Sequence, residues 1–225
     1  MAVAHSAASE STTGVTPSTS VASFSWTHTQ TGTPQGVLVF VYCLNSATAT
    51  ATSVTYGGIT VPAVTGGSTS DAAGEAGRID TYFLGAGLPS GNQTIVVNRT
   101  NNTVQMYATA ATVTALYNTE VNTANIVLLS GDQALAVQSV NDGWPGSFSV
   151  RYAGTYSGLQ TPPTAGTEST LLNSIDAGNF GAAMVRETTA GQGPRNVGFT
   201  GALDDVAAVH LAIREVRPKR VILYS

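Results

Sequence analysis

The sequence predicts an all-β protein: an antiparallel two-sheet β-sandwich, jelly-roll-like, with extended N- and C-terminal arms. Three observations carry this prediction. Only 10% of the 225 residues are charged, against roughly a quarter in an average globular domain. Thr, Ser, Ala, Val and 24 glycines take their place, in short alternating runs that end at turn residues. No segment shows a convincing apolar period of a helix.

The length and composition indicate one domain. A chain of this size can bury a large core, and a hydrophobic content of 42% excludes disorder over most of it. We expect the sandwich to span residues 21–217, between an N-terminal arm at 1–20 and a C-terminal tail at 218–225. The arm is rich in Ala, Ser and Thr without a sustained period, and has room for one short strand.

The first predicted strands already define buried and exposed faces. In residues 21–29, Trp26 and His28 share the more apolar of the two alternating faces. Residues 36–44 are continuously apolar, which predicts a central strand buried on both faces. Cys43, the only cysteine, lies in that strand and is expected to be a buried small hydrophobe.

The remaining predicted strands continue at similar spacing. They lie at residues 51–56, 59–64, 78–84, 93–98, 104–116, 125–130, 134–140, 147–156, 169–175, 182–188, 197–203 and 206–216. Turn signals separate them, such as Gly57-Gly58, which suits a tight turn with positive φ. The last strand alternates clearly and ends before Pro218, which cannot donate to a sheet.

The charge distribution singles out the C-terminal end. Residues 1–213 hold five basic and twelve acidic side chains, a net charge of −7, whereas four basic side chains follow within seven positions. We expect these charges to pair with an acidic neighbour while residues 221–224 add a strand to it. The candidate interface residues are Arg217, Lys219, Arg220, Ile222, Leu223 and Tyr224. So small a basic patch on an acidic body argues against nucleic acid as a partner.

No catalytic, cofactor-binding or metal-binding constellation emerges, so we do not expect an enzyme. The strand carboxylates Asp80, Glu187 and Glu215 are scattered, and no spacing picks out a pair for glycoside hydrolysis. His28 and His210 lack ligand spacing and are interpreted as structural, the former as a half-buried imidazole bonded to backbone.

Two acidic pairs leave calcium open as a minor alternative to ordinary turn chemistry. Asp204-Asp205 stands at the entry to the last strand, and Asp71 shares a Gly-rich loop with Glu75. The N-terminus shows no signal peptide, and no stretch approaches the ~20 apolar residues of a membrane span. We therefore expect no membrane partner. An exterior-type surface without a secretion signal fits a virion component or a protein exported by another route.

Several stretches, in order, resemble a known module. They are SWTHT at 25–29, GVLVFV at 36–41, SVTYGG at 53–58, RIDTYFL at 78–84 with PSG at 89–91, and the strand at 207–216 followed by Pro218. Together they resemble a widespread β-sandwich module of phage virion proteins and bacterial surface proteins. The resemblance covers most of residues 21–218, with 117–180 matching least. It implies capsid decoration, tail or fibre proteins that are often trimeric, and it offers no catalytic residues to carry over.

Two functions of different classes follow. The first is a structural virion protein, foremost a capsid decoration (cement) protein at the capsid surface, with the major capsid protein and its own copies, as a homotrimer, for partners. The alternative is a carbohydrate-binding or adhesive module of a tail fibre or bacterial surface protein. That role needs exposed aromatic side chains, for which Trp144, Tyr152 and Tyr156 are candidates. Trp144, in a loop with Gly and Pro, is the best of them, although such a Trp also serves as a loop anchor.

Overall fold

Antiparallel strands make up almost all of the described chain. The computed structural model describes residues 3–11, 21–30, 32–44, 46–71, 77–100, 104–134, 138–141, 146–156, 163–176, 180–188, 194–200 and 203–217. Within these ranges the only helix is a single 3₁₀ turn, Thr123–Asn125. The predicted all-β antiparallel sandwich is therefore confirmed.

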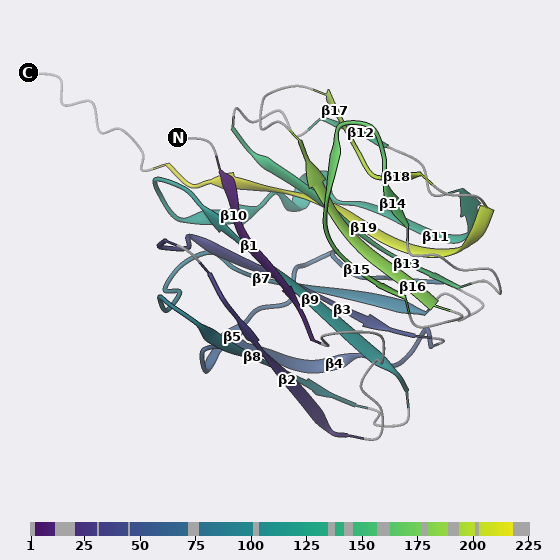
Figure 1. Ribbon diagram of the computed structural model, residues 1–225, viewed down its shortest axis with the longest axis horizontal. Helices are drawn as coiled ribbons and strands as arrows, with labels where there is room; N and C mark the ends of the chain where they lie inside the picture. The colour runs from purple at the N-terminus through teal and green to yellow at the C-terminus, as the bar shows by residue number, and fades with distance from the viewer. Residues whose placement is uncertain are drawn as a thin grey trace, which may run out of the picture.

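Three main sheets are stacked in layers (Figure 1). The central sheet runs in the order β1 (Ala4–Glu10), β9 (Met106–Thr114), β3 (Gly36–Cys43), β7 (Arg78–Leu84) and β6 (Thr69–Ser70). The lower sheet runs β2 (Ser23–His28), β8 (Gln93–Arg99), β4 (Ala51–Tyr56) and β5 (Ile59–Val61). The upper sheet runs β10 (Thr119–Val121), β19 (Leu203–Glu215), β13 (Phe148–Tyr156), β16 (Phe180–Glu187) and β15 (Ser169–Asp176), and β11 (Val127–Ala134) also pairs with β19.

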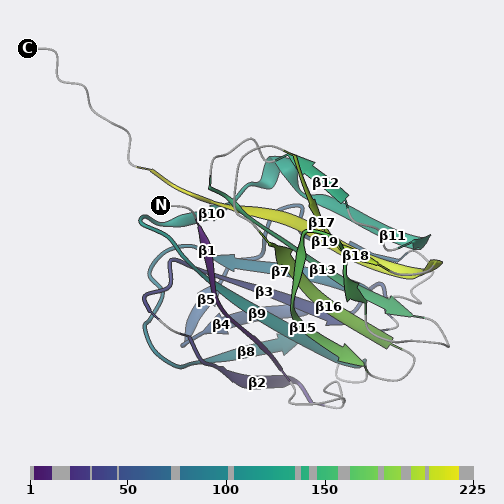
Figure 2. The ribbon, with the colours of Figure 1, turned by 45° about the horizontal axis from the view of Figure 1, so that its top comes forward.

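Two short ribbons complete the molecule. They pair β12 (Gln138–Asn141) with β17 (Pro194–Val197), and β14 (Thr164–Ala165) with β18 (Phe199–Thr200). Val197 and Phe199 from these ribbons share a buried apolar cluster with Ala153 and Val185 of the upper sheet. The ribbons thus cover the outer face of that sheet (Figure 2).

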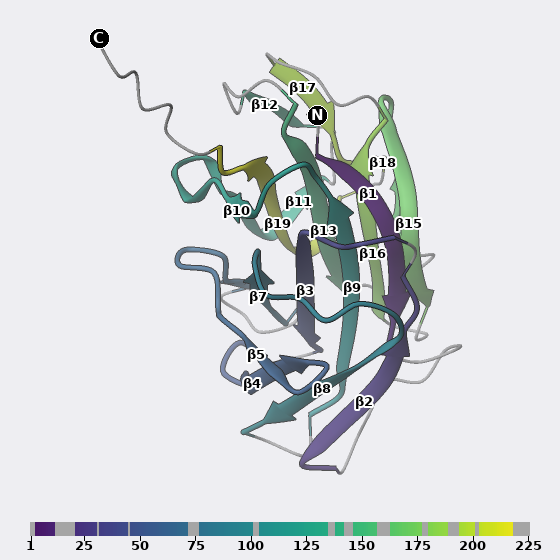
Figure 3. The same ribbon diagram turned by 90° about the vertical axis from the view of Figure 1, so that its left-hand side faces the viewer.

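Strand β3 lies in the middle of the stack and is buried along its whole length, as its continuous apolar sequence predicted. Because side chains alternate along a strand, β3 serves two cores. Val39 and its neighbours on that face pack with the lower sheet, whereas Phe40 and its neighbours pack with the upper sheet. Figure 3 shows the central sheet between the other two. Cys43 is buried and forms no disulfide, as expected.

The third layer is the main departure from the expected two-sheet arrangement. The sequence did not predict it, because the polar side chains of strands β9 and β13 suggested that one face of each strand is exposed to solvent. In the structure Thr109, Thr112 and Ser149 are buried all the same. Small side chains of this kind let a strand be covered on both faces.

The contact between Tyr42 and Gly154 shows how closely two layers approach. The Tyr42 ring, from β3, lies where a Cβ at Gly154 of β13 would stand. The Tyr42 hydroxyl group donates to the carbonyl of Thr155 at 3.4 Å. Gly154 is therefore required by the central–upper packing, not by its backbone conformation.

The two halves of the chain build different layers. The strands of residues 4–114 all belong to the central sheet, in the order β1-β9-β3-β7-β6, or to the lower sheet, in the order β2-β8-β4-β5. The upper sheet is then supplied by residues 119–215, from β10 to β19. This second half covers the face of the central sheet that the lower sheet leaves exposed.

The N-terminal segment, expected as an arm with room for one short strand, contains such a strand. Residues 4–10 form β1, an edge strand of the central sheet that pairs with β9. Val3 is fully buried in the core between the central and upper sheets, and its N–H donates to the carbonyl of Gly146 at 2.7 Å. An Ala/Ser-rich strand of this kind carries little apolar periodicity, so its place in the central sheet was not predicted.

Candidate docking site at the C-terminal groove

A groove of about 400 Å³ opens at the end of the upper sheet. We call it the C-terminal groove; it is lined by Gln35, Leu116, Tyr117, Asn118, Val216 and Arg217. Its apolar side chains are unusually exposed: Leu116 at 57%, Tyr117 at 39% and Val216 at 43%. They come from the turn between β9 and β10 and from the residue that follows β19.

The Glu215 carboxylate fixes the turn that carries Leu116 and Tyr117. Its Oε1 accepts the backbone N–H groups of Leu116 at 2.7 Å and Tyr117 at 3.0 Å. Val216 N–H donates to the carbonyl of Asn118 at 2.8 Å, which joins the turn to the chain after β19. These backbone polar groups form their hydrogen bonds within the chain, and the apolar side chains face outward.

Electrostatics keep this carboxylate ionised. Burial favours its neutral form, but the two N–H donors and Arg217 outweigh that effect, so the pKa of Glu215 is lowered. Arg217 lies 3.3 Å from Glu215 and its side chain is 65% exposed. On the neighbouring strand pair, Arg214 contacts Glu120 at 2.6 Å. The end of the upper sheet therefore carries fixed charges around an exposed apolar centre.

Of the predicted interface residues, Arg217 lines this groove. The other five, Lys219, Arg220, Ile222, Leu223 and Tyr224, lie outside the described residues, as does Trp144. Leu116, Tyr117 and Val216 were not among the residues predicted from the sequence. The available signal was the pair Leu116-Tyr117 standing directly before Asn118, an apolar pair where a polar turn would be expected.

His28 proves to be fully buried and bonded to side chains, which corrects the expected half-buried imidazole bonded to backbone. Its Nδ1 shares a 2.6 Å hydrogen bond with Ser9, and its Nε2 lies 3.2 Å from the Thr112 hydroxyl group. The indole N–H of Trp26 donates to the same Ser9 oxygen at 2.9 Å. Burial, then the nearby His5, lowers the pKa of His28 to about 4.

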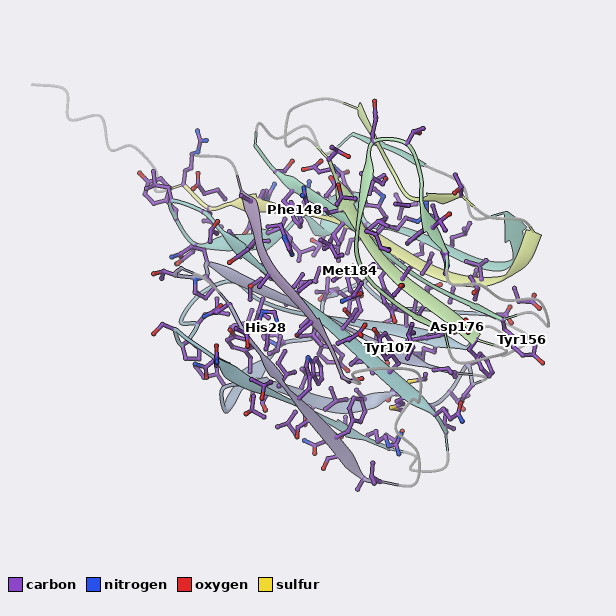
Figure 4. The ribbon with its side chains drawn as sticks, viewed as in Figure 1. His28, Tyr107, Phe148, Tyr156, Asp176 and Met184 are labelled. Atoms are coloured by element: carbon purple, nitrogen blue, oxygen red, sulfur yellow. The ribbon has the colours of Figure 1, made fainter. Side chains whose placement is uncertain are left out.

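This Ser9–His28 pair works as a crosslink. It joins β1, β2 and β9 across the central and lower sheets, and His28 lies within the layer between them (Figure 4). A nucleophilic serine relies on a base that a third group orients, commonly a carboxylate. Here the group that contacts the other ring nitrogen of His28 is the Thr112 hydroxyl, not a carboxylate. The Ser9 oxygen also accepts the Trp26 N–H.

His210 is buried in the upper sheet directly across from Arg151 on β13. Neither of its ring nitrogens has a hydrogen-bond partner among the described residues. Burial, and then the charge of Arg151, lower the pKa of His210 to about 3. Arg151 lies 5.9 Å from the Phe199 ring centroid, under the ribbon that covers this face. The site is closed to solvent and packs as part of the core.

The three strand carboxylates lie in different parts of the molecule. Asp80 pairs with Arg78 at 2.8 Å in the central sheet, Glu187 is buried in β16 of the upper sheet, and Glu215 holds the groove turn. No two of them face one another across a cleft.

Neither metal ligands nor a membrane helix are found in the described ranges. No cluster of three His, Cys, Asp or Glu side chains suited to a metal ion occurs there. Asp71 is described and buried, whereas Glu75 lies outside the described residues. No described helix has the length and apolar character to cross a bilayer.

No protein-family model, no curated protein and no solved structure matches the chain.

Proposed function

We propose that the protein is a structural virion protein, a capsid decoration (cement) protein that binds and stabilises the head shell. The observation that carries the proposal is the C-terminal groove. It places exposed Leu116, Tyr117 and Val216 beside the start of the basic C-terminal segment. Apolar side chains gathered within a polar rim are typical of a protein–protein contact.

The rest of the surface supports a passive role. With 10% of its residues charged, the chain desolvates at lower cost than an average surface when it lies against a shell. Three stacked sheets with extensive antiparallel pairing give a rigid body, as a stabilising component needs. No constellation of the described residues suggests turnover of a substrate.

Quantitative mass spectrometry of intact particles tests this proposal. Particles purified from cells that carry the gene are expected to contain the chain in a fixed, simple ratio to the major capsid protein, as an icosahedral lattice requires. Absence from the particles, or a few copies per particle without a fixed ratio, would overturn the cement role.

The alternative, a carbohydrate-binding module, rests on a different part of the molecule. Tyr152 is excluded as a glycan contact because it is fully buried and stacks on Phe40 at 5.0 Å. Trp144 stays a candidate outside the described residues. Of the described candidates, Tyr156 is partly exposed, contacts Phe180 with ring centroids 5.0 Å apart, and lies near exposed Asp176 at the same end of the upper sheet (Figure 4). An aromatic pair beside a carboxylate suits a sugar ring. Glycan-array binding that Tyr156→Ala abolishes, by a protein absent from virions, would establish this alternative.

A further inference from the structure

The C-terminal groove collects a large share of the exposed apolar surface. Seven large hydrophobic side chains are exposed in the described chain, and Leu116, Tyr117 and Val216 are three of them. The other four, Val21, Ile59, Leu128 and Leu171, do not line this groove. Apolar side chains concentrated in this way call for a covering partner.

The chain itself supplies a segment that matches the groove. Eight residues follow Arg217, and four of them, at 221–224, are consecutively apolar: Val, Ile, Leu and Tyr. An extended apolar segment docks into a groove through side chains such as Leu and Tyr, which bury large areas.

Residues 221–224 are poorly placed to fill the groove of their own chain. Val216 hydrogen-bonds to Asn118, so Val216 and Arg217 form part of the groove wall. Pro218 disfavours the α conformation at Arg217. Only Pro218, Lys219 and Arg220 lie between the groove wall and residues 221–224, which leaves a short connection for a return into the groove of the same chain.

We propose that residues 221–224 of one copy occupy the C-terminal groove of a second copy, so that the chains associate by exchanging their C-terminal segments. This inference rests on the proposed function, since it makes the same groove the self-association site of a virion component.

A disulfide test identifies the occupant directly. One chain carries Tyr117→Cys in the groove, and a second, differently tagged chain carries Leu223→Cys in the segment. After co-expression and mild oxidation, mass spectrometry is expected to find a disulfide that joins the two introduced thiols and so links the two tags. The native thiol does not interfere, because burial raises the pKa of Cys43 to about 12. Placing both changes in one chain and finding only an intrachain bond would overturn the exchange.

Sedimentation velocity supplies the second readout. The full chain is expected to associate with a dissociation constant that Leu116→Asp raises at least about tenfold, since a Leu side chain at an interface is worth that much or more. Removal of residues 218–225 is expected to do the same. The matched control is Leu171→Asp, a residue of β15 with 43% exposure that lies outside the groove, and it should leave association unchanged.

Circular dichroism and thermal unfolding of each variant establish that the fold is retained. A full chain that stays monomeric at high micromolar concentration would overturn the proposal. So would an oligomer that survives both the truncation and Leu116→Asp. These measurements use the isolated protein, so their failure is distinct from failure of the virion role, which depends on particles alone.

Discussion

The ring of Tyr42 on β3 occupies the space above Gly154 on β13, and the absence of a side chain at 154 allows the central and upper sheets to close on one another. The two residues are 112 positions apart in sequence, so neither β3 nor β13 alone signals the contact.

Gly154→Ala is expected to lower the free energy of unfolding by about 1–3 kcal/mol, because the added methyl group meets the Tyr42 ring inside a packed core. Chemical denaturation measures the loss. In a Tyr42→Leu background the same change should cost clearly less, since the smaller side chain leaves room for the methyl group. Equal costs in the two backgrounds would show that the ring does not limit residue 154.

Deletion of residues 1–11 is expected to destabilise the protein by several kcal/mol, because it removes buried Val3 and an entire edge strand. It also removes Glu10, which accepts a 2.6 Å hydrogen bond from buried Tyr107. Thermal unfolding of the truncated chain measures this loss. An unchanged midpoint would mean that the segment is a dispensable arm after all.

Stability is expected to fall as the pH drops below about 6.5. The folded-state pKa values of His28 and His210 are about 4 and about 3, below the unfolded value of 6.5. The unfolded chain therefore takes up protons first, and for His28 alone the loss reaches about 3 kcal/mol by the time the pH passes below 4.

Denaturation at a series of pH values between 7 and 3 checks this expectation. His28→Gln and His210→Leu should each flatten the slope of stability against pH, because neither replacement side chain takes up a proton in this range. A slope identical to that of the wild type in both variants would assign the acid sensitivity to other groups.

Glu215→Ala is expected to weaken self-association although Glu215 does not line the groove, because its carboxylate holds the N–H groups of Leu116 and Tyr117. The loss of a charged acceptor should also cost about 1–3 kcal/mol of stability. Glu120→Ala is the control: it breaks an ion pair with Arg214 on the same strand pair but leaves the turn anchored. Sedimentation velocity compares the two, and equal effects would argue against the role of the turn.

The sequence predicted the strands in which the buried positions carry the more apolar side chains. Residues 36–44 are apolar throughout and form the doubly buried β3. Trp26 and His28 lie on the inward face of β2 as their alternation indicated. These signals are local, so a single sequence suffices to find them.

The rest depends on contacts between distant segments. Thr112 and Ser149 look like surface residues until a second sheet is placed over them. Residues 4–10 become a strand only by pairing with β9, about a hundred residues later. The groove arises because Glu215 fixes a turn at Leu116 and Tyr117, a relationship that no local pattern contains.

The C-terminal groove, filled by residues 221–224 of a neighbouring copy, is proposed to build the oligomer that attaches to the capsid. Co-sedimentation with particles that lack the protein tests it most directly, using the full chain, Leu116→Asp, the chain without residues 218–225, and the control Leu171→Asp. The full chain and Leu171→Asp are expected to sediment with the particles at saturating, lattice-like stoichiometry, whereas the other two remain in the supernatant. Binding of all four proteins with equal affinity would contradict it and assign attachment to another face.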